Sequence, residues 1–552
     1  MPKTVLSSSF FPFVVSYDAP ANAVNVSSLL DAPAGRHGFV RAVGDHFETD
    51  AGPIRFNGIN LTGPANFPDR ERAARMADRL ARFGFNCVRL HYMDADYGNF
   101  MQPPARCLVE PSGETEFAFR ADRLDRLDFL AAELKRRGIY VYLNLHVARL
   151  MKRKGETWLA PELIASEKEY ARRLLTHVNP YTGLAWADDP VVALVELNNE
   201  DAVYDALPET KGTNWWRSAE IQRRFAPQIL PYLHEMARFL KDDLGVRAPI
   251  AGTQVDWSSK VVQAELDFVD THDYWCHPSP VNANWTITDA PMVNYAGGPY
   301  YSPDLIEMNR CPGKPYTVSE ACTPYPNAYG AEGLLLLRAY AAALGWNGLF
   351  FYTYSNVEND EPDHVEYFFS AIARTDVLAH LPAAANLMLC GNGETTTLEV
   401  RDGYCVCSTP QTRFFAGFVR HRAFDLGGGF SLFPGETERD WLAISLTETA
   451  PGRLLIAATA MARNHGAKTT VHRQNGEGYD VVSTRGEDWG SGPFEVEGVT
   501  ARLLLPAGCS RAWALDERGE RRMEIPVRET DGGMELLISS AYRTVWYEVQ
   551  TC

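Results

Sequence analysis

The stretch VVALVELNNED, residues 191–201, begins with an apolar run and ends in four polar residues. The apolar run is typical of a buried β-strand, because it is short, rich in β-branched residues and bounded by polar ones. The apolar run is followed directly by Asn198, Asn199, Glu200 and Asp201. A strand that only filled a core would have no use for two amides and two carboxylates. Its end is therefore predicted to belong to a functional site.

Similar apolar strands recur along the chain and alternate with helical segments. Two of the helices end at glycines, Gly84 and Gly138, just before the next strand, as helix C-termini prefer. The predicted strands are residues 54–61, 86–93, 140–147, 191–200, 249–257, 268–275, 315–321 and 348–355. The predicted helices are residues 70–84, 119–138, 217–243 and 332–345. Eight strands in this alternation predict an α/β fold of the (β/α)8 TIM-barrel type. A doubly wound open sheet is the rival fold, but no GxGxxG follows the first strand.

The chain is long enough for two or three domains, because it has 552 residues and single cores stop growing well below that size. Residues 1–50 are predicted to form a short N-terminal β segment that packs on the barrel of residues 51–380. Helical periodicity then ends. Residues 390–552 show alternating strands and turns, which predict a C-terminal all-β sandwich.

The amino-acid composition limits the classes of partner that the protein is expected to bind. The net charge of -17 argues against nucleic acid and anionic membranes, because both would repel an acidic protein that lacks a basic patch. No segment has the roughly 20 apolar residues of a membrane span. The N-terminus, MPKTVLSSSFFPFVV, has no long apolar region or small-residue cleavage site, so a cytoplasmic location is expected. The ten scattered cysteines are expected to be reduced thiols, and a homo-oligomer is left open.

Polar residues stand at the ends of six predicted strands, where barrel enzymes carry their catalytic groups. They are Arg89 and His91, Asn144 and His146, Asn199 and Glu200, His272 and Tyr274, Ser319 and Glu320, and Tyr352 and Tyr354. Glu200 and Glu320 belong to strands four and seven, nearly across the barrel. Such a pair suits glycoside hydrolysis with retention, in which carboxyl groups about 5–5.5 Å apart act as acid/base and nucleophile.

This ordered set resembles the clan A glycoside hydrolases, and among them the cellulase-like enzymes of family 5, over roughly residues 51–360. The resemblance implies that Glu200 is the general acid/base and Glu320, in YTVSEA, the nucleophile. It also implies that Asn199 binds the sugar 2-hydroxyl, that Arg89 keeps Glu320 ionised and that Tyr274 donates a hydrogen bond to it. His146 and His272 are expected to line the pocket.

Aromatic residues near these strand ends are candidate sugar platforms. Many family 5 enzymes carry a tryptophan at the end of strand eight. Here the sequence reads FFYTYSN, so Tyr354 or Tyr352 is expected in its place. Trp215 and Trp285, in loops after strands four and six, are the other candidates.

A metal site is the alternative use of the polar strand ends. His91, His146 and His272 lie on three strands, and imidazoles in that arrangement would suit zinc. No HxxxH or HxH spacing supports such a site, so no metal is predicted. Glu196 is expected to be a buried polar residue that shares a strand face with Glu200.

The sequence therefore predicts a retaining β-glycosidase with a carbohydrate substrate and no cofactor, because two carboxyl groups suffice. Long loops after strands three, four and six favour a closed pocket, and so exo action on a terminal sugar or short oligosaccharide. A transglycosylase using the same glycosyl-enzyme and a non-catalytic carbohydrate-binding protein are alternatives. The sugar and the linkage stay open.

Overall fold

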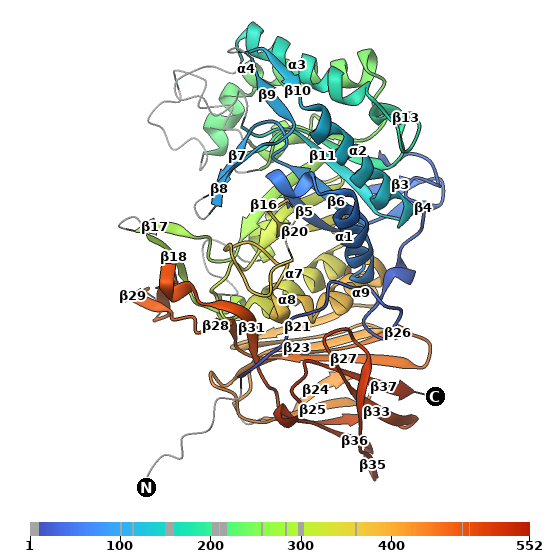
Figure 1. Ribbon diagram of the computed structural model, residues 1–552, viewed down its shortest axis with the longest axis vertical. Coiled ribbons are helices and arrows are strands. Elements are labelled where there is room, and N and C mark those ends of the chain that lie inside the picture. Colours follow the sequence, from blue (N-terminus) through green and yellow to red (C-terminus); the bar gives the residue numbers. More distant parts are fainter. Residues whose placement is uncertain are drawn as a thin grey trace.

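The centre of the computed structural model is an eight-stranded parallel sheet that curves into a barrel (Figure 1). The structure describes residues 10–551 except 100–101, 113–114, 149–158, 201–208, 210–217, 256–257, 282–283, 296–302, 359–360, 421, 477 and 485. The strands follow one another in the sheet as β15, β14, β11, β6, β5, β20, β19 and β16. Their bounds are β5 Phe56–Thr62, β6 Cys87–His91, β11 Tyr140–His146, β14 Val192–Asn198, β15 Ile250–Ala251, β16 Val269–Tyr274, β19 Tyr316–Cys322 and β20 Gly348–Ser355.

The two edges of this sheet meet just after β15. The N–H of Val255 donates to the carbonyl of Asp270 over 2.9 Å, and Val255 and Thr271 form a parallel bridge. All seven residues of β5, β11, β14 and β19 are buried, as expected for parallel strands covered on both faces. The predicted (β/α)8 fold is confirmed.

Helices follow the strands and surround the barrel. The first begins at Asp69, whose carboxylate accepts the N–H of Arg72 over 2.9 Å. Gly84 and Gly138 follow α1 and α2 with φ of 73° and 80°, the left-handed conformation that stops a helix. The bounds are α1 Arg70–Arg82, α2 Ala121–Arg136, α3 Pro161–Leu175, α4 Ala219–Arg238, α5 Lys260–Gln263, α6 Pro303–Met308, α7 Gly330–Leu344, α8 Thr375–Leu378 and α9 Leu381–Cys390. Helix α3 was not among the predicted helices.

The N-terminal segment contacts two different parts of the molecule. Strands β2 (Arg41–Val43), β3 (His46–Thr49) and β4 (Gly52–Ile54) form a small sheet, and Phe47 of β3 packs edge-on against Phe268 at 5.4 Å. Strand β1 (Phe10–Pro12) pairs instead with β31 (Ser491–Glu497), near the end of the chain. The predicted domain boundaries stay a prediction.

The C-terminal region consists of two antiparallel sheets with a shared apolar core. The larger sheet has the order β21, β22, β23, β26, β27, β37, β33 and β34, and the smaller one β24, β25, β32, β36 and β35. Their bounds are β21 Thr397–Arg401, β22 Tyr404–Ser408, β23 Thr412–Phe418, β24 Phe424–Gly427, β25 Phe430–Pro434, β26 Trp441–Ala450, β27 Arg453–Thr459, β32 Ala501–Leu505, β33 Cys509–Leu515, β34 Arg521–Ile525, β35 Val527–Thr530, β36 Gly533–Ile538 and β37 Trp546–Thr551.

The barrel and the sandwich share two junctions. Helices α7 and α9 lie between the barrel and the larger sheet (Figure 1). Closer to the strand ends, the hairpin β17 (Ser279–Val281) and β18 (Asn284–Thr288) follows β16 and pairs with β30 (Asp480–Ser483), which in turn pairs with β29 (Thr470–Gln474). Strands of the C-terminal region that lie outside the two sandwich sheets therefore reach the end of the barrel that carries the polar strand ends.

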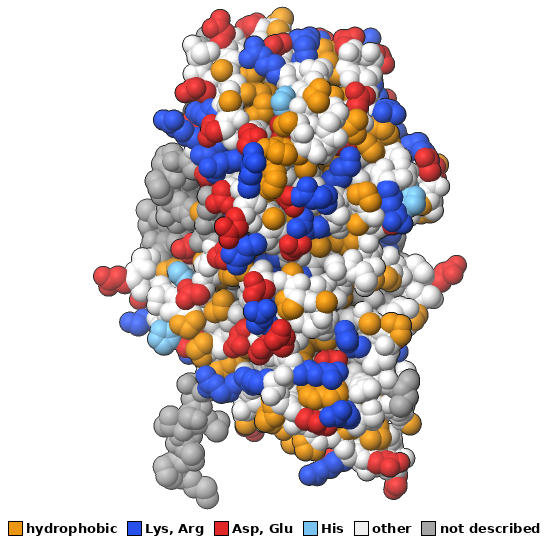
Figure 2. All heavy atoms as spheres, turned by 45° about the vertical axis from the view of Figure 1, so that its right-hand side comes forward, with side chains coloured by type: hydrophobic (Ala, Val, Ile, Leu, Met, Phe, Trp, Pro, Cys, Tyr) orange, Lys and Arg blue, Asp and Glu red, His pale blue; other side chains and the backbone are white. Residues whose placement is uncertain are grey.

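Within the part of the chain that the structure describes, no helix has the length and apolar character to cross a bilayer. Figure 2 shows acidic and basic side chains intermixed over one face of the molecule.

Candidate active site

Arg89, at the end of β6, joins three residues from other strands. Its side chain is fully buried, and its guanidinium donates to Glu320 Oε1 over 2.7 Å and to Glu196 Oε2 over 2.7 and 3.0 Å. It also donates to the amide oxygen of Asn199 over 2.7 Å. Burial lowers the pKa of Arg89, but Glu196 and Glu320 outweigh it, and the pKa is raised. One cation thus holds the ends of β6, β14 and β19 together.

Glu320 lies in β19, and its carboxylate is held from two sides. Oε1 accepts from Arg89, and Oε2 accepts a short hydrogen bond from the Tyr274 hydroxyl on β16. Burial and the charge of Glu320 raise the pKa of Tyr274 well above its usual value, so Tyr274 stays a donor. Only 4% of the Glu320 side chain is exposed.

Glu200 follows β14 in a backbone conformation that ends the strand. Its φ of 49° breaks the alternation of the strand, and its N–H donates to Gln254 Oε1 over 2.6 Å. Its side chain is 27% exposed, in contrast to that of Glu320, and Oε1 lies 2.8 Å from His272 Nδ1. Burial lowers the pKa of His272, but Glu320 and Glu200 outweigh it, so the pKa is raised.

The two predicted catalytic carboxyl groups converge. One oxygen of Glu200, one nitrogen of His272 and one oxygen of Glu320 lie within 4.8 Å of one another. This separation suits the retaining geometry of about 5–5.5 Å between carboxyl groups. The group could also be read as metal ligands. However, the guanidinium of Arg89 and the hydroxyl of Tyr274 already occupy Glu320, and a second cation there would be repelled.

Glu196 is a buried partner in this network. Its Oε1 accepts a short hydrogen bond from the side-chain amide of Gln254, which also accepts the N–H of Glu200. Burial raises the pKa of Glu196 to about 7, although Arg89 opposes this shift. Glu196 is therefore a buried partner of Arg89 inside the barrel. Unlike Glu200, it is not one of the two converging carboxyl groups.

The other predicted residues fall into two groups. His91 joins the site: its Nδ1 lies 2.9 Å from Asn144 Oδ1 and 3.8 Å from Glu320 Oε1. His146 instead lies against Tyr170 of α3, with ring centroids 5.2 Å apart. The structure thus does not bring His91, His146 and His272 together as zinc ligands.

The two tyrosines predicted as aromatic platforms lie in different places. Tyr354 is misplaced for a platform: its hydroxyl accepts from Arg79 of α1 over 3.0 Å, so it points out of the barrel. Tyr352 occupies the site instead, edge-on to His91 at 5.6 Å and to Tyr274 at 5.8 Å. The two tyrosines face opposite ways because the pairing of β20 with β5 is irregular between Phe351 and Ser355.

Trp285 lies half-buried in β18, in the hairpin after β16, and its stacking on sugar stays a prediction. Trp215 falls outside the described residues. Sequence reasoning missed two residues that support the site: Gln254, which bonds to Glu196 and Glu200, and Asp270, which accepts from Ser319. Gln254 lies within the predicted strand of residues 249–257, and Asp270, in FVDTHDYW, lies two residues before His272, but neither has a local feature that separates it from other strand residues.

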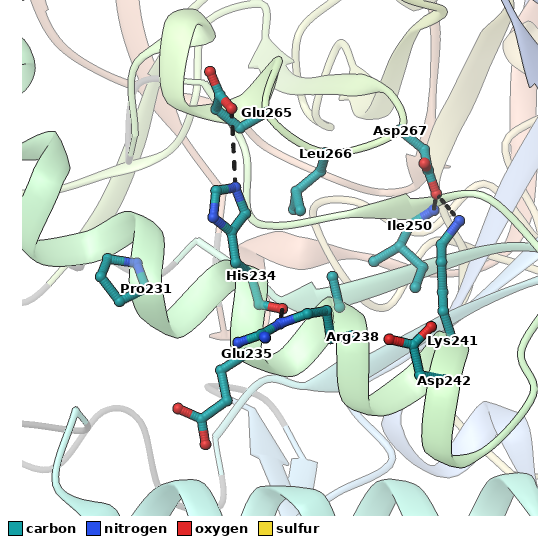
Figure 3. Close-up of a pocket in the computed structure, with 11 residues that line it drawn as sticks. Pro231, His234, Glu235, Arg238, Lys241, Asp242, Ile250, Glu265, Leu266 and Asp267 are labelled. Atoms are coloured by element: carbon teal, nitrogen blue, oxygen red, sulfur yellow. Dashed lines mark hydrogen bonds and ion pairs between the residues drawn. The ribbon is translucent and has the colours of Figure 1, made fainter.

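A separate open cavity of about 610 Å³ lies outside the barrel, near its opposite end (Figure 3). It is lined by α4 and the segment before β16, and ion pairs occupy its polar groups. Lys241 lies 2.6 Å from Asp267, and His234 lies 3.9 Å from Glu265. Its carboxylates are therefore partly used in pairing, and it contains none of the residues predicted for catalysis.

Sequence comparison finds relatives with a named activity. The chain is 26% identical to mannan endo-1,4-beta-mannosidase 1 and 28% identical to putative mannan endo-1,4-beta-mannosidase 9, both of Oryza sativa subsp. japonica, over 208 residues each. The matches cover 34% of this chain and 46% and 48% of those proteins, so the chain spans about half the length of the curated relatives it matches.

Among solved structures, a glycoside hydrolase family 5 mannosidase from Rhizomucor miehei is similar to the chain, with a TM-score of 0.45 at 12% identity. The similarity covers 64% of this chain and 98% of that one. No family model matches the chain. The matches to the two named mannosidases agree with the resemblance to glycoside hydrolases.

Proposed function

We propose that the chain is a retaining β-glycosidase that hydrolyses β-mannosidic bonds by double displacement. One observation carries the proposal: two carboxyl groups from strands four and seven lie within 4.8 Å and have different surroundings. Glu320, held by Arg89 and Tyr274 with its carboxylate fixed from two sides, is suited to attack the anomeric carbon. Glu200, more exposed and beside His272, is suited to exchange protons with the leaving group and with water.

In the first step, Glu320 displaces the leaving group and forms a glycosyl ester, while Glu200 gives its proton to the departing oxygen. In the second step, Glu200 takes a proton from water, and the oxygen of that water replaces Glu320 at the anomeric carbon. Arg89 already binds the amide oxygen of Asn199, which leaves the amide nitrogen to donate to a sugar hydroxyl. That contact fits the predicted role of Asn199 at the 2-hydroxyl.

The choice of mannosides rests on the names of the two rice relatives, and both names specify endo action on mannan. The length of the loops in the sequence favours exo action on a terminal sugar or short oligosaccharide, and we include this preference in the proposal. The products formed from mannohexaose separate the two modes. Stepwise release of mannose indicates exo action, and early products of intermediate length indicate endo action.

The test compares the wild type with Glu320→Ala and Glu200→Ala on 4-nitrophenyl β-D-mannopyranoside and on mannohexaose. We expect Glu320→Ala to lose activity on both substrates. We expect Glu200→Ala to keep more activity on the nitrophenyl substrate, because nitrophenolate leaves without protonation. Glu265→Ala, at the cavity in Figure 3, is the matched control. Full activity of Glu320→Ala would refute the assignment of the nucleophile.

A further inference from the structure

The segment after β20 returns over the candidate active site and places Phe369 beside Tyr274. The ring of Phe369 lies 5.1 Å from that of Tyr274 and 5.6 Å from that of Tyr352. Tyr274 in turn donates a hydrogen bond to Glu320, the predicted nucleophile. The ring of Tyr274 therefore connects Phe369 to Glu320. Phe369 is only partly buried, whereas most described phenylalanines of the barrel core are fully buried.

A second exposed ring continues this surface. His277, after β16, lies 5.5 Å from Phe369 and 5.1 Å from Tyr274, and it is exposed. We use the term aromatic wall for Phe369 and His277, the two rings that flank Tyr274 and remain in contact with solvent. Flat rings beside a polar carboxylate pair suit a sugar, which presents hydroxyl groups at its edge and C–H groups on its face.

The C-terminal region holds the segment that carries Phe369. Asn464 of β28 (Ala462–His465) accepts the N–H of Val365 and donates to its carbonyl, both over 2.8 Å. The indole N–H of Trp489 donates a short hydrogen bond to the same carbonyl. Asn464 is fully buried, and the N–H of Phe494 in β31 donates to the carbonyl of Asp363 over 2.6 Å. Two residues of this segment are thus tied to the sandwich side of the molecule.

The two neighbouring phenylalanines of the segment face opposite ways. Phe368 packs edge-on against Trp489 at 5.5 Å, whereas Phe369 packs against Tyr274. The backbone between these contacts is fixed to the barrel, because Thr353 and Phe369 are joined by an N–H to carbonyl bond of 2.8 Å. The position of Phe369 therefore depends on contacts from both the barrel and the C-terminal region.

We propose that the aromatic wall of Phe369 and His277 is a sugar-binding subsite next to Glu320, and that Asn464 and Trp489 are positioning residues for it. The proposal rests on the proposed function and adds to it a role for the C-terminal region. The ligand class is a pyranoside whose C–H face packs on the wall. Because this contact exists before and during the reaction, its loss raises KM and leaves kcat nearly unchanged.

The test measures kcat and KM on 4-nitrophenyl β-D-mannopyranoside. We expect Phe369→Ala to raise KM about fivefold at constant kcat and Phe369→Tyr to restore it, because a ring contact of this kind contributes modestly. Trp489→Phe removes the N–H donor and part of the ring that packs on Phe368, and it is expected to raise KM about twofold. Phe418→Ala, a partly buried phenylalanine beside Tyr329 at the other junction, is the control.

A double variant separates positioning from general damage to the fold. If Trp489 acts through Phe369, Trp489→Phe adds nothing to the KM of Phe369→Ala, because the wall is already lost. Additive effects of the two substitutions, or an unchanged KM in Phe369→Ala, would overturn the subsite. As long as the wild type is active, either result leaves the proposed function intact. A wild type that cleaves neither the nitrophenyl mannoside nor mannohexaose would instead overturn the proposed function, and with it a sugar as the occupant of the wall.

Discussion

At the scale of single residues, His272 links Glu200 to a carboxylate deep in the barrel. Its Nε2 lies 2.9 Å from the Ser319 hydroxyl, which donates to the fully buried Asp270. Since the only proton of that hydroxyl points to Asp270, its oxygen accepts the Nε2–H of His272. His272 Nδ1, 2.8 Å from Glu200, is therefore the atom that shares a proton with the predicted acid/base.

This connection predicts a pH effect of Ser319→Ala. Without the hydroxyl, the imidazolium of His272 loses an acceptor that is tied to the charge of Asp270. The pKa of His272 then falls, so the proton that it shares with Glu200 is lost at lower pH, and we expect the basic limb of kcat/KM against pH to move down by about one unit. Thr317→Val is the matched control, because Thr317 donates to Asp270 over 2.5 Å without meeting His272. Equal shifts in both variants would argue against the connection.

Residue type and strand position indicated several residues that the structure brings together. Arg89, Glu200, His272, Tyr274 and Glu320 are polar groups at the ends of apolar strands, and all five meet in the structure. Residues that support them from behind could not be found in this way. Gln254 and Asp270 carry no local signal, because their roles depend on which strands the barrel places next to one another.

At the scale of elements, departures from regular strands decide which way side chains point. The period of two places Glu196 and Glu200 on one face of β14. In the structure, Asn198 donates outward to Tyr232 of α4 over 2.9 Å, and Glu200 has a positive φ. The same effect separates Tyr352 from Tyr354 in β20. Alternation therefore predicted the strands but not the last residues of each, where the predicted catalytic groups lie.

The layered packing of the barrel predicts a large effect of one methyl group. A Cβ added to Gly58 in β5 would lie 2.0 Å from the ring of Phe350 in β20, far inside contact distance. Both residues are in the barrel interior, where neighbouring strands leave little room to shift. We expect Gly58→Ala to lower the free energy of unfolding by about 1–3 kcal/mol, measured by urea denaturation.

Gly476→Ala is the control for this substitution, because its added Cβ meets nothing within 4 Å and its φ is not in the left-handed region. Truncation of the opposing ring offers a second check. In Phe350→Leu, the further cost of Gly58→Ala is expected to be smaller, since the clash is relieved. Equal costs of Gly58→Ala in both backgrounds would contradict this account of the packing.

At the scale of the whole molecule, a buried glutamate connects the barrel to the sandwich. Glu332 of α7 accepts the N–H of Val293 over 2.9 Å and the indole N–H of Trp441, in β26, over 3.3 Å. The sequence indicated both parts but not this junction, because the glutamate stands in an ordinary helical stretch, EGLLLLRAYAAALG. Burial raises the pKa of Glu332 to about 7 from 4.5, against the hydrogen bonds from Val293, Trp441 and Met292 that favour its charge.

The raised pKa makes stability depend on pH in a definite direction. The folded protein holds the Glu332 proton more tightly than the unfolded chain, so the contribution is complete below pH 4.5 and is lost as the pH rises to about 7. Glu332→Gln stays neutral and loses this slope. We expect its free energy of unfolding to fall by about 3 kcal/mol less than that of the wild type between pH 4.5 and 8, in urea denaturation. Glu307→Gln, which neutralises a partly buried acceptor of the Trp346 indole, is the control. Parallel curves for the wild type and Glu332→Gln would refute the prediction.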